Sequence, residues 1–227
     1  VIFCFKVIMH KSVQNLIEIE KEIKLNLSNL DIVNLPKIIA VSKTFKIDKI
    51  LPLIEYGHTD FGENKVQEAI NKWDNLRETN SNIKLHMIGK LQTNKVKLAV
   101  KFFDYIHSVD SQKLAKKIAD EQQKINKKIK IFIQVNIGNE DQKSGINKVE
   151  LGNLVDYCKQ INLNIEGLMC IPPNDLDTSS YFGEMNLLNK NFNLSELSMG
   201  MSSDYLKASE NLSTYLRIGS KIFGQRS

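Results

Sequence analysis

The sequence has little cysteine. Its three cysteines, Cys4, Cys158 and Cys170, lie far apart, and none forms the C-x-x-C spacing of a zinc or redox site. A sparse, odd set of this kind argues against a disulfide framework and is typical of proteins kept in a reducing compartment. We therefore expect a cytoplasmic protein that is stabilised by its hydrophobic core.

The chain also lacks a long apolar run. Residues 1–9 are apolar but are interrupted by Lys6, and they are too short to cross a bilayer. A secretory signal would need a basic start, a longer apolar core and a small-residue cleavage site, and none is visible. We therefore expect no membrane partner. Met9 is a candidate for the natural start, which would make residues 1–8 an upstream extension.

Charge of one sign is not concentrated anywhere in the chain. The 31 Lys and Arg residues exceed the 26 Asp and Glu residues by a net charge of +5, and lysines are spread over helical stretches such as 113–130. We interpret this excess as solvated helix faces and expect no nucleic-acid partner. A barrel that binds phosphate or RNA through its positive charge remains an alternative.

What the sequence does contain is a regular alternation of short apolar runs and amphipathic segments. Such an alternation predicts right-handed βαβ units and a parallel sheet. Predicted strands cover residues 38–42, 59–62, 84–88, 105–109, 129–135, 165–169, 196–199 and 215–218. Predicted helices cover residues 13–30, 48–56, 65–77, 93–102, 111–125, 148–160, 179–190 and 203–211, and we expect Asp110 to cap the one that begins at 111.

Eight strand–helix units in about 180 residues favour a closed (β/α)₈ barrel of the TIM type over a doubly wound open sheet. No G-x-G-x-x-G follows the first strand, and the polar candidates end several strands instead of meeting at one switch point. No linker or repeat divides the chain. We predict a barrel over residues 37–227, with residues 1–36 as an N-terminal extension and a helix packed on it.

The first predicted strand ends abruptly on a lysine. Residues 38–44 read IIAVSKT, a continuous apolar run that suits a strand buried on both faces. Side chains alternate along a strand, so Ile39, Val41 and Lys43 would share a face, with Lys43 at the carboxyl end. A desolvated amine there can lose its proton near neutral pH and attack a carbonyl carbon. A lone lysine more often reaches water.

Motifs spread along the chain extend this interpretation. They are AVSKT (40–44), FGEN (61–64) with VQE (66–68), HMIG (86–89) with LQTNK (91–95), QVNI (134–137) with KSG (143–145), GLM (167–169) with IPP (171–173), SMGMSSD (198–204) and LRIGSKIFG (216–224). In this order, from about Lys37 to Arg226, the sequence resembles the YggS/PROSC family of pyridoxal phosphate homeostasis proteins. One departure is Leu212, which stands where that family usually has glycine.

The resemblance implies a barrel of the fold-type III class, like the N-terminal domain of alanine racemase, that holds pyridoxal 5′-phosphate (PLP). It makes Lys43 the Schiff-base lysine and places Arg217 at the pyridine nitrogen. The loops after the seventh and eighth strands are a recurrent phosphate site in such barrels. There we expect the hydroxyl groups of Ser198 and Ser202. We also expect the backbone N–H groups of Gly219 and Ser220 and the hydroxyl group of Ser220.

Several of these residues have a second interpretation. Asn64 is a plausible neighbour of the cofactor or the N-cap of the helix that begins at Lys65, and Ser202 could simply cap a helix. His86 suits a hydrogen-bonded core residue better than a catalyst. Lys143 is a candidate for a second, weaker amine that binds the aldehyde.

The resemblance also bears on activity. Racemases and decarboxylases of this barrel type carry a second β domain that supplies an acid or base, and only Ser227 follows Arg226 here. We therefore expect a monomeric PLP carrier in vitamin B6 homeostasis, not an enzyme, with PLP-requiring apoenzymes as possible partners. The alternative is a slow PLP-dependent enzyme of the racemase kind with a base from the barrel, such as His86 or Tyr205.

Overall fold

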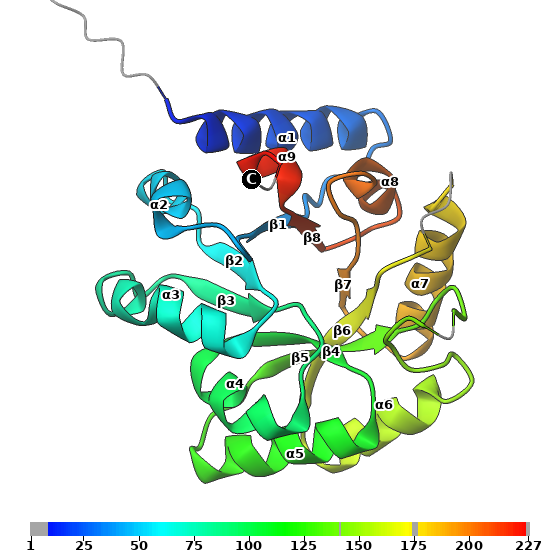
Figure 1. The fold of residues 1–227 in the computed structure, drawn as a ribbon. Helices are drawn as coiled ribbons and strands as arrows, with labels where there is room; N and C mark the ends of the chain where they lie inside the picture. The colour runs from blue at the N-terminus through cyan, green and yellow to red at the C-terminus, as the bar shows by residue number, and fades with distance from the viewer. Residues whose placement is uncertain (1–8, 141, 174–176, 226–227) are drawn as a thin grey trace, which may run out of the picture.

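The computed structural model describes residues 9–140, 142–173 and 177–225, so Cys4, Arg226 and the proposed extension 1–8 lie outside the described residues. In the described part, eight parallel strands close into a barrel in sequence order (Figure 1). They are β1 (Lys37–Val41), β2 (Asp60–Glu63), β3 (Lys84–Met87), β4 (Tyr105–Val109), β5 (Lys130–Val135), β6 (Asn164–Cys170), β7 (Glu196–Ser198) and β8 (Tyr215–Ile218). The predicted (β/α)₈ barrel is confirmed.

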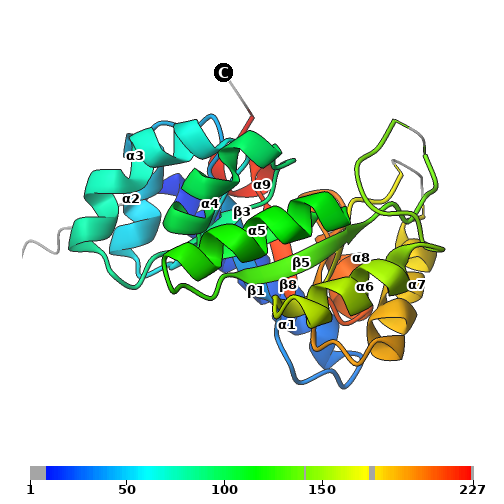
Figure 2. The same cartoon turned by 90° about the horizontal axis from the view of Figure 1, so that it is seen from below.

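Helices cover the outside of this barrel, and each predicted helix overlaps an observed one. In the view from below, α5 and α6 lie alongside β5 (Figure 2). The helical elements are α1 (Lys11–Ser28), α2 (Ile47–Glu55), α3 (Val66–Thr79), a 3₁₀ turn η1 (Thr93–Lys95), α4 (Val96–Phe102), α5 (Gln112–Lys124), α6 (Leu151–Gln160), α7 (Ser179–Asn191), α8 (Tyr205–Glu210) and α9 (Ser220–Phe223). No helix in the described ranges is long and apolar enough to cross a membrane.

Alternation along the strands divides the apolar residues into two sets. The larger set faces the helices and includes fully buried residues such as Phe61, Leu85 and Ile106. The smaller set lies inside the barrel and consists of Ile39, Tyr105, Phe132, Met169 and Tyr215. The interior is therefore a packed core, not a pore, and a site has to form at the ends of the strands.

Helix α1 crosses the barrel next to the last two helices (Figure 1). Its buried residues recur at helical spacing, namely Val13, Leu16, Ile19, Ile23 and Leu27. This stripe packs against α2, α8 and α9. The amide of Asn15 also donates to the carbonyl oxygen of Ile222 in α9 at 2.9 Å. Helix α1 therefore holds α9 against the barrel.

The expected cap of α5 is wrong, and the two alternative caps, Asn64 and Ser202, are not observed at α3 and α8. Ser111, not Asp110, caps α5, because its side chain accepts from the N–H of Leu114. The N-caps of α3 and α8 are Lys65 and Asp204, and neither makes a side-chain capping bond. Asn64 and Ser202 therefore do not cap the helices for which a cap was considered.

Candidate functional site

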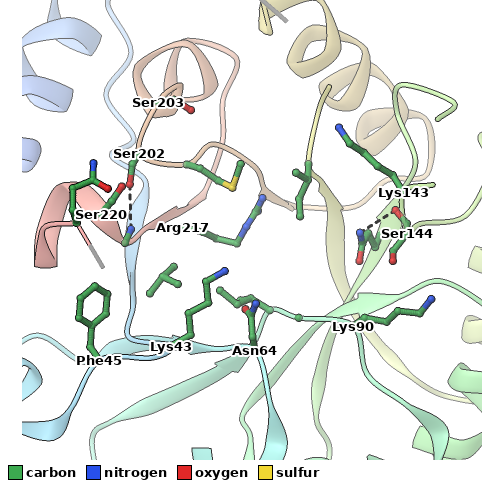
Figure 3. Close-up of a pocket in the computed structure, with 18 of the residues that line it drawn as sticks. Lys43, Phe45, Asn64, Lys90, Lys143, Ser144, Ser202, Ser203, Arg217 and Ser220 are labelled. Carbon is green, nitrogen blue, oxygen red and sulfur yellow. Dashed lines mark hydrogen bonds between the residues drawn. The ribbon is translucent and has the colours of Figure 1, made fainter. Parts of the chain in front are cut away.

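A cavity of about 800 Å³ opens at the carboxyl ends of the strands. Its lining comes from the ends of β1, β5 and β8 and from the loops after β1, β2, β3, β5, β6, β7 and β8. Six of the seven predicted site residues line it: Lys43, Asn64, Ser202, Arg217, Gly219 and Ser220. Residues that are far apart in the sequence thus meet at the end of the barrel where sites of this fold form (Figure 3).

Lys43 lies in a tight turn just beyond β1, which ends at Val41 and not at Ser42 as predicted. The N–H of Phe45 donates to the carbonyl oxygen of Ser42 at 3.1 Å and closes the turn. Thr44 has a φ of 68°, a left-handed conformation that is unusual for a β-branched residue. The turn directs the Lys43 side chain into the cavity toward Arg217 (Figure 3).

A buried carboxylate anchors this turn from behind. Glu63 Oε1 accepts from the Ser42 hydroxyl at 2.7 Å, from Lys72 Nζ at 2.9 Å and from Trp73 Nε1 at 3.0 Å. Lys72 also donates to the carbonyl oxygen of Ser42 at 2.8 Å. The N–H of Thr44 in turn donates to Glu68 at 2.7 Å. The turn that carries Lys43 is therefore held from two elements: β2 supplies the Glu63 carboxylate, and α3 supplies Lys72, Trp73 and Glu68.

Arg217 is the most informative residue of the cavity. It is only 4% exposed, and it donates to the Ser198 hydroxyl and to the carbonyl oxygen of Cys170, both at 2.8 Å. Both partners are neutral, and no carboxylate of the described residues forms an ion pair with it. Burial lowers the pKa of Arg217 from its usual value, yet a guanidinium stays charged at neutral pH. A buried cation of this kind favours a ligand with an electron-rich atom.

Polar donors gather on the side of the cavity formed by the loops after β7 and β8. The Ser202 hydroxyl oxygen accepts from the backbone N–H of Gly219 at 3.3 Å and of Lys221 at 3.4 Å. Gly219 directly precedes α9, and Ser220 begins it. This cluster of N–H and hydroxyl groups around one point is suited to an anion such as a phosphate.

Asn64 lines the cavity beside Lys43 (Figure 3). The loop after β3 passes so close that a Cβ on Gly89 would lie 2.5 Å from the carbonyl oxygen of Asn64. Only glycine permits this approach, so HMIG and FGEN, motifs that are separate in the sequence, depend on each other in space. The approach places Asn64 at the cavity edge.

Ser198 is the predicted site residue that does not line the cavity. It is fully buried in the barrel, where its hydroxyl contacts His107 Nδ1 and Arg217 NH1, both at 2.8 Å. Its side chain follows the alternation of β7 and points inward beneath the cavity. It thus contacts the guanidinium and not the space where Ser202 and Gly219 lie.

The surroundings of His86 and Lys143 are also defined. His86 is fully buried and hydrogen-bonded to Asp60 and His107, as a core histidine would be. Lys143 lines the cavity, but its amine lies 2.6 Å from Glu140 Oε2 and donates to the carbonyl oxygen of Pro172.

Sequence reasoning missed other parts of the site. Phe45 and Met201 contribute apolar lining, and Phe45 stacks on Phe223 with ring centroids 4.8 Å apart. The alternation of predicted strands and helices does not by itself show that Glu63 and His107 support the site. A signal for Glu63 was its place inside the FGEN motif, because a charged residue within a buried strand needs a partner.

The fold and cavity agree with what comparison with known proteins finds. Residues 21–227 match the family described as alanine racemase, N-terminal domain. The pyridoxal phosphate homeostasis protein of Vibrio alginolyticus is 37% identical over 201 residues, which cover 84% of this chain and 86% of that protein. The protein of the same name from Escherichia coli (strain K12) is 34% identical over 199 residues, which cover 83% and 85%.

Solved structures give the same result. PipY of Synechococcus elongatus PCC7942, in a structure with PLP bound, is 33% identical with a TM-score of 0.77, and the match covers 89% of this chain and all of PipY. An alanine racemase of Clostridium difficile 630 shares only the fold, at 15% identity, a TM-score of 0.66 and 57% coverage of that enzyme.

The closed barrel and the family match define a protein of the class formed by the N-terminal barrel of alanine racemase. Within that class, the chain belongs to the family of pyridoxal phosphate homeostasis proteins. The resemblance seen in the sequence is confirmed. Leu212, where the resemblance implies a glycine, has a φ of 64°, a left-handed conformation that favours glycine.

Proposed function

We propose that this chain binds PLP in the cavity at the carboxyl ends of the strands and serves PLP homeostasis without turning over amino acids. The buried guanidinium of Arg217, which lies beside the amine of Lys43, carries the proposal. The anion donors around Ser202, the names of the curated relatives and the PLP bound in the PipY structure support it. When bound, PLP supplies an aldehyde and an electron-withdrawing ring.

The residues have distinct tasks in this proposal. Lys43 binds the aldehyde carbon through its amine with loss of one water molecule. Arg217 donates to the ring nitrogen and keeps it unprotonated, because guanidinium does not give up its proton at neutral pH. Ser202, Gly219 and Ser220 donate to the phosphate. Asn64 bounds the space beside Lys43.

Ser198 has a different task from the one expected. Because it is fully buried beneath the cavity and bonded to Arg217, we assign it to holding the guanidinium and not to the phosphate. Lys143 keeps its place as a candidate second amine. Its amine lies in an ion pair with Glu140, 2.6 Å from Oε2.

The lining of the cavity supports a binding role over catalysis. Among the described residues that line it, there is no Asp, Glu, His, Tyr or Cys, so general acid–base groups other than lysine are missing from it. The bases considered for a slow enzyme, His86 and Tyr205, both lie outside this lining. We propose that the chain is not an enzyme and that it supplies PLP to apoenzymes as a cytoplasmic monomer.

The first experiment tests covalent binding. The purified protein is incubated with PLP, reduced with borohydride and digested, and the labelled peptide is identified by mass spectrometry. We expect a visible absorbance band and a label on Lys43. Lys43→Ala should abolish both, whereas Lys90→Ala, at a lysine of the same cavity, should keep the label. A colourless wild-type protein would contradict the proposal and favour the phosphate- or RNA-binding alternative.

A second experiment separates carrier from enzyme. The PLP-loaded protein is incubated with amino acids in D₂O, and exchange of the Cα hydrogen is followed by NMR. No exchange above that of free PLP is expected. Transfer is then measured by the recovery of activity of an apo-aminotransferase, and size-exclusion chromatography gives the oligomeric state. Exchange well above free PLP that is lost in His86→Gln would instead show the slow enzyme.

A further inference from the structure

A row of hydrogen-bonded polar side chains crosses the barrel beneath the cavity, among its apolar interior residues, where barrels of this kind usually carry bulky branched residues. Asp60 Oδ1 lies 3.1 Å from His86 Nε2, and His86 Nδ1 lies 2.9 Å from His107 Nε2. His107 Nδ1 lies 2.8 Å from the Ser198 hydroxyl, which lies 2.8 Å from Arg217 NH1. Four hydrogen bonds thus join strands β2, β3, β4, β7 and β8 in one line.

The two ends of this line fix its direction. A carboxylate only accepts, so His86 donates from Nε2 to Asp60, and a neutral imidazole then accepts at Nδ1. His107 must therefore donate from Nε2 to His86 and accept at Nδ1 from the Ser198 hydroxyl. Arg217 only donates, and it donates to the remaining lone pair of Ser198. Each of the four hydrogen bonds thus has one donor and one acceptor. An additional proton on either histidine would place two donors opposite each other in one of these bonds.

The surroundings favour the neutral form of both histidines. Both are fully buried, and burial lowers their pKa values, for His107 well below the usual value. The His86 ring stacks on Tyr105 and the His107 ring on Phe132, each with centroids 4.3 Å apart. The ionisable groups around the two rings are Asp60, Asp104, Lys84, His58, Arg217, Tyr105 and Tyr215.

The far end of the line reaches a second cavity. Asp60 lines a space of about 500 Å³ between α1 and the start of the barrel, together with His58 and Lys37. Its other carboxylate oxygen accepts from the Thr59 hydroxyl at 2.6 Å, so the carboxylate is held at both oxygens. The line therefore runs from one end of the barrel to the other, with fixed groups at each end.

We propose that Asp60, His86, His107 and Ser198 are positioning residues of the cofactor site, because their one-directional hydrogen-bond chain fixes the orientation of Arg217. Ser198 and the carbonyl oxygen of Cys170 each hold one terminal nitrogen of the guanidinium, which sets its plane. The directions of the remaining N–H groups of Arg217 are then set by this row of hydrogen bonds and not by the ligand. The inference rests on the proposed function, since the gain from a preset Arg217 is realised only when PLP binds.

The test compares Ser198→Ala with Ser108→Ala in the full chain. Ser108 is also buried, on the same strand as His107, and its hydroxyl has no partner among the described residues, so this control removes the same atom without touching the chain. Ser198→Ala should weaken PLP binding about tenfold or more, as expected when a charged donor loses its partner. It should also shift the absorbance maximum of bound PLP. Ser108→Ala should match wild type in both.

Two further measurements keep the test decisive if Ser198→Ala folds poorly. Asp60→Asn acts from the opposite end of the chain and should shift the absorbance maximum in the same direction. In the protein without PLP, ¹H–¹⁵N correlation spectra should show His86 and His107 as neutral Nε2–H forms from pH 6 to 9. An Nδ1–H or charged form of either ring would show that the proposed one-directional series of hydrogen bonds is wrong.

These outcomes distinguish the two proposals. If wild-type protein binds PLP and both Ser198→Ala and Asp60→Asn behave like Ser108→Ala, the positioning role is wrong and the proposed function stands. If wild-type protein binds no PLP, the proposed function fails, and the positioning role fails with it whatever the histidine forms are.

Discussion

The guanidinium of Arg217 shows how a single residue can define a site. It is buried, no carboxylate of the described ranges pairs with it, and its two neutral acceptors satisfy hydrogen bonds but not charge. Proteins seldom keep such a group unless a ligand or a mechanism uses it. The same logic applies to Asp60, whose carboxylate is buried at the other end of the same chain of side chains and interacts with His86 and Thr59.

The pH dependence of stability should report on Asp60. Although burial opposes ionisation, its hydrogen bonds from His86 and Thr59 prevail and lower its pKa from 3.8 to about 2. A carboxyl with a lowered pKa stabilises the folded state above its unfolded pKa, and this contribution is lost as the pH falls toward the folded value. The free energy of unfolding of wild type should exceed that of Asp60→Asn at pH 6.

That difference should shrink between about pH 4 and pH 2, where the carboxylate of Asp60 takes up its proton. Urea denaturation at each pH measures it. Asp156→Asn, at an exposed aspartate of α6, is the control and should follow wild type throughout. A difference between wild type and Asp60→Asn that stays constant down to pH 2 would contradict the assignment.

At this scale the sequence predicts which residue types gather but not which way each one faces. The motifs around Lys43 and Arg217 contain residues that line one cavity. Ser198 stands in the same motif as Ser202, yet it is the last residue of β7 and its side chain points into the barrel. His107 carried no motif, because its role follows from contacts with residues 21 and 91 positions away. Such distant contacts follow only from the closed barrel.

The turn after β1 links a strand, a helix and the functional lysine. Ser42 and Thr44 flank Lys43, and their groups bond to Glu63 and Glu68, which come from β2 and α3. The alternation of strands and helices was predictable from hydrophobic patterning, as the agreement of the elements shows. The cap and turn details were not, because a polar residue near a helix start can equally bond to a neighbouring loop, as Ser202 does.

Glu63→Gln should weaken the hydrogen bonds that hold the turn after β1 in place. The substitution removes the charge that holds the Lys72 ammonium, and Lys72 is itself only 9% exposed at its side chain. Breaking a buried pair from one side costs about 3 kcal/mol in the free energy of unfolding, measured by urea denaturation. Because the Ser42 hydroxyl donates to the same carboxylate, we also expect slower labelling of Lys43 by PLP and borohydride.

The control for this change is Glu78→Gln, at an exposed glutamate of the same helix α3. It should alter the free energy of unfolding by less than about 0.5 kcal/mol, as surface substitutions usually do. Equal stability of the two variants would mean that Glu63 does not hold Lys72 and the turn.

At the scale of the whole molecule, helices from early and late in the sequence pack together near the site. Helix α1, near the start of the chain, lies over α9, near its end, and α9 begins beside the proposed phosphate donors (Figure 1). The sequence predicted the apolar stripe of α1, because helical spacing is a local property. It did not predict α9 as a helix or its bond to Asn15, since that contact joins residues 207 positions apart. Barrel closure brings these residues together.

Asn15→Ala tests whether α1 supports the site through α9. The substitution removes the bond to the carbonyl oxygen of Ile222 and should lower the free energy of unfolding by about 1 kcal/mol. Because Gly219 and Ser220 begin the same short helix, we also expect faster dissociation of PLP, measured by transfer to an apo-aminotransferase. Asn34→Ala, at an exposed asparagine between α1 and β1, should leave both quantities at their wild-type values. Loss of stability without faster dissociation would show that α1 braces the barrel but not the phosphate donors.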